Sequence, residues 1–97
     1  MHQFICFLTP SREGMPDDPT PEESKAAMAH FEYYKQLHSN GTLILAGRTQ
    51  TPPHTGILVF EAPDLNSAQE IANTDPAVIA GVFNTRVQPY NVALMRE

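Results

Sequence analysis

Two short runs with a composition typical of β-strands, both apolar at every position, limit the fold of this chain more than any other feature. They cover residues 4–8 and 57–60. Both are rich in residues that favour β-structure and are bounded by turn-forming residues, as buried strands are. Because successive side chains of a strand point to opposite faces of its sheet, both faces of this sheet are predicted to be apolar and covered.

The full pattern predicts four strands and two helices, with one additional helical turn. The strands are expected at residues 4–8, 42–46, 56–61 and 82–94, with a proline-stiffened hairpin connection at 49–54. Pro89 must lie on an edge strand or at a bulge, because proline cannot donate to a sheet hydrogen bond. The helical segments are a helix that ends near Gly41, a second helix at 65–72 capped by Asp64, and a turn from Asp75-Pro76 to Ala80 that stops at Gly81.

The start of the first helix is the best-defined boundary in the chain. Thr20 can cap the helix, Pro21 suits its first position, and Glu23 completes a capping box. The preceding residues 10–20 hold three prolines and one glycine, which predicts an irregular loop. A loop of that length is often functional, for example as a lid.

The order β-α-β-β-α-β predicts an α+β, ferredoxin-like fold with a four-stranded antiparallel sheet, in a single domain over residues 1–97. Its two helices can cover only one face of the sheet. Soluble monomers rarely leave an apolar patch of several hundred Å² in water. A second copy is therefore expected to cover the other face, giving a homodimer packed sheet to sheet.

Composition excludes several classes of protein. The net charge is −5, and the six Lys and Arg residues are scattered, so the chain has no basic stripe for nucleic acid. Its apolar runs are far shorter than the roughly 18 residues of a membrane span. The first residues carry no basic leader, which predicts a cytoplasmic protein. Cys6 is the only cysteine and is interpreted as a small buried hydrophobic residue in a reducing compartment.

His30 stands out on the first helix. At about 100° per residue it falls on the same arc as Ala27, Phe31, Tyr34 and Leu37, so it is expected to face the interior. A buried imidazole needs partners for its ring nitrogens, and those partners set its tautomer. His30 is thus the first candidate for chemistry, with a core histidine bound to a backbone carbonyl as the alternative.

The chain resembles the YCII-related (YciI-like) family over nearly its whole length. The segments that carry the resemblance are His30-Phe31…Leu37…Gly41-Thr42-Leu43…Ala46-Gly47-Arg48, Asp75-Pro76-Ala77-Val78-Ile79-Ala80-Gly81-Val82-Phe83 and Val87-Gln88-Pro89-Tyr90. The most specific of them is the run that begins with Asp75-Pro76, because its spacing and composition are hard to obtain by chance.

This resemblance implies a dimeric α/β barrel of ferredoxin-like subunits and a His-Asp pair, which falls on His30 and Asp75. It also implies kinship with a dehydrochlorinase of chlorinated-aromatic breakdown, with muconolactone isomerases and with small monooxygenases. A carboxylate that orients an imidazole makes a general base. Asp followed by Pro is also a common helix start, so Asp75 is equally a candidate cap. One carboxylate oxygen can cap while the other faces His30.

Other residues are candidates for binding a substrate. Arg48, at the end of a strand, could hold a carboxylate or enolate oxygen, and Arg12 could close over the same cavity as part of a lid. Tyr34 and Phe83 could line an apolar pocket. The alternatives are two solvated arginines and two ordinary core aromatics.

The sequence favours no metal and no cofactor. His30 and His38 are about 12 Å apart along the helix, too far to bind one ion, and His2 and His54 are expected on the surface. No phosphate loop or dinucleotide fingerprint is present. The leading hypothesis is a small cofactor-independent enzyme of isomerase or dehydrochlorinase type, acting on an anionic or phenolic metabolite. The alternatives are a non-catalytic ligand-binding or sensor module and a purely structural dimer.

Overall fold

The computed structural model describes residues 1–15 and 17–96. Its elements are β1 (His2–Pro10), α1 (Pro21–Ser39), β2 (Leu43–Arg48), β3 (Gly56–Ala62), α2 (Leu65–Asn73), α3 (Pro76–Ile79) and β4 (Phe83–Pro89). The strands form one antiparallel sheet in the order β2-β3-β1-β4. This confirms the α+β, ferredoxin-like prediction, with α3 as the expected additional turn.

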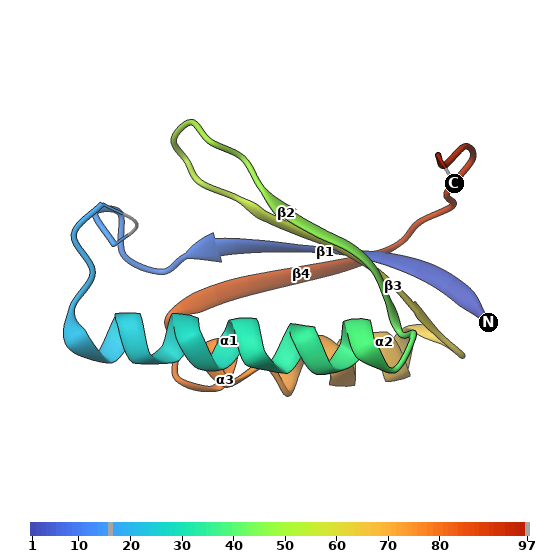
Figure 1. Cartoon of the computed structure of the whole chain (residues 1–97), viewed down its shortest axis with the longest axis horizontal. Helices are drawn as coiled ribbons and strands as arrows, with labels where there is room; N and C mark the ends of the chain where they lie inside the picture. Colours follow the sequence, from blue (N-terminus) through green and yellow to red (C-terminus); the bar gives the residue numbers. More distant parts are fainter. Residues whose placement is uncertain (16, 97) are drawn as a thin grey trace.

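All three helices lie on one face of the sheet (Figure 1). Alternate residues of the two central strands point toward them and form the core, namely Phe4, Cys6 and Leu8 from β1 and Leu58, Phe60 and Ala62 from β3. The residues between them point to the other face, where Ile5 lies opposite Val59 and Phe7 opposite Ile57. Both faces are apolar, and among the described residues no helix covers the second one (Figure 1).

The last strand is shorter than predicted. β4 ends at Pro89, although the pattern predicts a strand to residue 94. Pro89 lies opposite Phe4, so only two further residues of β1, Gln3 and His2, are left to pair with. The backbone nitrogen of Tyr90 still donates to the Gln3 carbonyl, whereas that of Val92 donates to the Gln3 side chain. Pro89 lies on an edge strand, as predicted.

The buried stripe of α1 is rotated relative to the prediction. Phe31 is 63% exposed and Ala27 is also exposed, while Ala26 and Tyr34 are buried. Ala26 packs against Ala77 of α3, so α1 contacts α3 as well as the sheet. Tyr33 packs against the core in place of Phe31, which lies outside it.

No helix of the described residues is both long and apolar enough to span a bilayer.

Candidate active site

His30 and Asp75 are in direct contact, although 45 residues separate them in the chain. The Nδ1 atom of His30, on α1, lies 2.5 Å from Oδ2 of Asp75, between α2 and α3. A carboxylate oxygen accepts hydrogen bonds, so the imidazole donates from Nδ1. The lone pair of the neutral ring is then on Nε2.

Asp75 serves two partners at once. Its Oδ1 accepts a hydrogen bond of 2.9 Å from the backbone nitrogen of Ala77, which caps α3, while Oδ2 faces His30. The residue is 0% exposed. The cap and the histidine partner, which the sequence leaves as alternatives, are therefore the two oxygens of one buried carboxylate.

Two aromatic rings pack against the His30 imidazole. Tyr34 and Phe83 meet the His30 ring edge to face, with centroids 5.0 and 5.2 Å away. The side chain of His30 remains 21% exposed, so a ligand can reach it. Tyr34 is buried, and burial is the main cause that raises the pKa of its phenol. Tyr34 therefore acts on His30 as a neutral packing partner.

A cavity of about 680 Å³ opens beside His30, within the usual range for small-molecule sites. It lies between α1 and the β2–β3 hairpin, and its wall is mainly apolar. The residues that bear on its chemistry are His30, Phe31, Phe83, Glu23, Arg48 and His54. The structure thus brings His30, Arg48 and Phe83 to one cavity, while Tyr34 lies behind the imidazole and is not part of the cavity wall.

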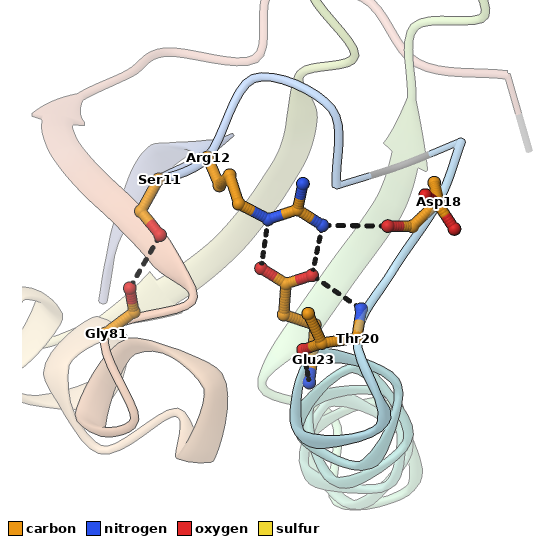
Figure 2. Close-up of polar contacts among 6 residues, drawn as sticks. All are labelled: Ser11, Arg12, Asp18, Thr20, Glu23 and Gly81. Atoms are coloured by element: carbon orange, nitrogen blue, oxygen red, sulfur yellow. Dashed lines mark hydrogen bonds and ion pairs between the residues drawn. The ribbon is translucent and has the colours of Figure 1, made fainter.

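Arg12 is engaged elsewhere. Its guanidinium forms a bidentate pair with Glu23, at 2.9 Å from Nε and 2.6 Å from Nη2, and also donates to the Asp18 carbonyl (Figure 2). Glu23 in turn accepts from the backbone nitrogen of Thr20, which completes the predicted capping box. Arg12 therefore ties Asp18 to the first turn of α1 and does not line the cavity, in contrast to its predicted place beside a substrate.

Glu23→Gln is expected to keep the capping box and lose the ion pair with Arg12. The Arg12 guanidinium, with help from the Thr20 backbone, lowers the pKa of Glu23 from 4.5 to about 2. A lowered native-state pKa stabilises the fold fully above the unfolded-state pKa, and this gain is lost as the pH falls through the native value. The free energy of unfolding, measured in urea, should therefore be higher for the natural chain at neutral pH. The difference should shrink between pH 4.5 and 2, and a pH-independent difference would contradict this origin.

Arg48 and His54 lie on the hairpin side of the cavity. Among the described residues, no hydrogen bond or ion pair engages the Arg48 guanidinium, which leaves it available to an anion. His54 is half-buried, so it lies at the surface as predicted and also borders the cavity, which the sequence did not predict. The hairpin pairing Arg48↔Gly56 carries residue 54 to the cavity. The register of the two strands could have predicted that His54 lies beside the cavity, whereas the composition of the loop could not.

Within residues 1–15 and 17–96, no group of three or more His, Cys, Asp or Glu side chains is placed to hold a metal ion. Cys6 is buried on β1, with Sγ 2.9 Å from the Thr85 hydroxyl. Burial raises the pKa of this thiol above its ordinary value. Cys6 is therefore a protonated core residue, in agreement with its interpretation from the sequence.

The sequence model of the YCII-related domain matches residues 3–91, which is nearly the whole chain. The chain belongs to the YCII-related family. A search of curated protein sequences finds no match to this YCII-related protein.

Solved structures of other proteins share its fold. The 5-chloro-2-hydroxyhydroquinone dehydrochlorinase TftG from Burkholderia phenoliruptrix AC1100, solved with 2,5-dihydroxybenzoquinone, has a TM-score of 0.72 at 19% identity, covering 92% of this chain and 93% of that one. A muconolactone isomerase has a TM-score of 0.67 at 14% identity, with coverage of 98% and 96%. The uncharacterised protein TM1266 from Thermotoga maritima has a TM-score of 0.56 at 11% identity, with coverage of 92% and 95%. At these identities the likeness shows the fold.

Proposed function

We propose that this YCII-related protein is a small enzyme that transfers protons on a compact cyclic metabolite without a cofactor. The observation that carries the proposal is the fully buried Asp75 carboxylate. One of its oxygens is held by the α3 cap, and the other binds Nδ1 of His30 at the edge of a cavity. This arrangement presents Nε2 of His30 as a base of fixed orientation.

In this mechanism, Nε2 of His30 removes a proton from a carbon next to a carbonyl or enol group. The electron pair of the broken C–H bond moves into the ring of the substrate, and the Asp75 carboxylate stabilises the imidazolium that forms. In an isomerisation the same proton returns to another carbon. In an elimination from a hydroxylated ring, His30 moves a proton from one hydroxyl to the carbon that bears chlorine, and chloride then leaves with its bonding pair while a second hydroxyl loses its proton to solvent.

The walls of the cavity favour an anionic or phenolic ring. Phe31 and Phe83 offer aromatic surface, and Arg48 offers a charged, forked donor for a carboxylate or enolate oxygen. The dehydrochlorinase and the muconolactone isomerase that share the fold act on compounds of this kind, a chlorinated hydroxyhydroquinone and a lactone.

A second copy of the chain is the proposed partner, and the uncovered face of the sheet supports this. Ile5, Phe7, Ile57 and Val59 lie on that face, and Leu45, opposite Val59, is 47% exposed. Each copy would present the same surface, as a two-fold interface requires. Arg86 is part of this surface, because its guanidinium lies 4.5 Å from the centre of the Phe7 ring.

The C-terminal tail extends this surface. Gln3, which points to the uncovered face, binds the backbone of Val92, so the tail leaves along the rim of that face. Its next large apolar side chains, Leu94 and Met95, are 95% and 61% exposed. A second copy that packs against both the sheet face and this tail would remove their apolar side chains from water.

His30→Gln tests the proposed function, because the glutamine amide can still donate to Asp75 and keep the fold. Turnover is measured as exchange of carbon-bound hydrogen in muconolactone and as chloride release from 5-chloro-2-hydroxyhydroquinone. We expect loss of a general base to slow whichever reaction the protein catalyses by about 10²- to 10⁴-fold. Binding of 2,5-dihydroxybenzoquinone should persist.

The same variant separates an enzyme from a ligand-binding module. A binding module would turn over neither compound, and His30→Gln would change only its affinity for 2,5-dihydroxybenzoquinone. A variant as active as the natural chain would rule out His30 as the base.

A further inference from the structure

A second imidazole borders the cavity from the opposite wall. His54 belongs to the β2–β3 hairpin, whereas His30 belongs to α1, and both line the same space. The Nδ1 atom of His54 lies 3.2 Å from the backbone carbonyl of Thr49. A carbonyl only accepts, so this Nδ1 donates, and the lone pair of the neutral ring is on Nε2. His54 is thus in the same tautomer as His30.

The hairpin end that carries His54 is built by its own hydrogen bonds. The Thr49 backbone nitrogen donates to the Thr55 carbonyl at 2.9 Å, and the Thr55 nitrogen donates to the Thr49 hydroxyl at 2.8 Å. That hydroxyl donates in turn to the Pro53 carbonyl at 3.2 Å. Residues on both sides of His54 are therefore held, which positions its ring against Thr49.

His54 also borders a second hollow, of about 540 Å³, on the outer side of the hairpin. Ser11, Glu13 and Asp17 line this hollow, and all three are exposed. The imidazole therefore lies between the inner cavity, where His30 stands, and an outer space that is open to water. A group in that position can exchange a proton with either side.

We propose that His54 is a second acid/base residue of this site, which takes the proton of a substrate hydroxyl. The inference rests on the proposed function and adds a step to it. The O–H bond of the substrate breaks, its electron pair stays on oxygen, and a new N–H bond forms at Nε2 of His54. The imidazolium then releases this proton to water through the outer hollow.

A phenolic substrate needs such a second base. Ionising a ring hydroxyl moves electron density into the ring. Because His30 handles the proton that is transferred at carbon, a different group must accept the hydroxyl proton. The charged groups that face His54 suit this role. Glu13 and Asp17 line the outer hollow, Arg48 on the inner side favours an ionised hydroxyl, and Glu23 is already paired with Arg12.

Two probes separate the roles of His54 and His30, because muconolactone has no hydroxyl group and 5-chloro-2-hydroxyhydroquinone has several. We expect His54→Gln to slow chloride release from 5-chloro-2-hydroxyhydroquinone by about 10²-fold at neutral pH. The loss should shrink as the pH rises, because the hydroxyl then ionises without help. Hydrogen exchange in muconolactone should be unchanged in His54→Gln and lost in His30→Gln. His38→Gln, an exposed histidine at the end of α1, is the matched control and should change neither rate.

A measurement that needs no turnover accompanies these rates. Nitrogen NMR of the imidazoles should show His54 with its proton on Nδ1, and saturation with 2,5-dihydroxybenzoquinone should shift the Nε2 signal of His54 but not that of His38. Equal losses on both probes, a loss that does not depend on pH, or an unshifted His54 signal would overturn the assignment of His54 and leave His30 in place. If the natural chain turned over neither probe, or if His30→Gln kept its activity, the proposed function would fail, and this step with it.

Discussion

Asp75→Asn is expected to abolish activity while the protein stays folded. The asparagine oxygen can still accept from the Ala77 backbone and cap α3, so that contact survives. Its amide nitrogen now faces Nδ1 of His30 as a donor, which forces Nδ1 to accept and moves the proton to Nε2. The imidazole then has no lone pair toward the cavity. By analogy with other carboxylate-oriented imidazoles, a tautomer inverted in this way costs on the order of 10⁴-fold in rate.

Nitrogen NMR and turnover test this together. The natural chain should show the His30 proton on Nδ1 and Asp75→Asn should show it on Nε2, with the loss of rate following the change of tautomer. Asp64→Asn is a matched control, because Asp64 caps α2 through the Ser67 backbone nitrogen at 2.8 Å in the same way. That control should keep both the rate and the His30 tautomer. Full activity in Asp75→Asn would show that the orientation of His30 does not matter.

Ile5→Lys is expected to turn a dimer into a folded monomer. Ile5 lies on a central strand in the uncovered face of the sheet, opposite Val59. In a monomer the lysine can extend its stem over the apolar face and keep its charge in water. In a sheet-to-sheet dimer the same charge would be buried without a partner, at a cost of about 3 kcal/mol or more. Such a cost weakens association by at least ~100-fold.

Light scattering after gel filtration at micromolar concentration measures this directly. The natural chain should have twice the single-chain mass of 10.8 kDa, and Ile5→Lys should have that single-chain mass with an unchanged circular dichroism spectrum. Gln36→Lys places the same charge on the exposed side of α1 and should remain a dimer. A natural chain of single-chain mass, or an Ile5→Lys variant that still dimerises, would contradict the proposed interface.

Local chemistry accounts for the parts of the fold that could be predicted from the sequence. The capping box of Thr20 and Glu23 lies within four residues, and α1 begins where it indicates. Gly41 and Gly81 have the positive φ values, 85° and 76°, that end a helix. Local chemistry did not predict the candidate site. Only the family resemblance predicted that His30 and Asp75 form a pair.

What the sequence by itself determined is the set of elements, their order and the two apolar faces of the sheet. These follow from spacing and capping among residues close together in the chain. Only the tertiary structure decided that Phe31 faces a cavity, that Arg12 is bound to Glu23, and that His54 stands across the cavity from His30. Each of these depends on how elements pack, and periodicity along one element does not report which other element will rest against it.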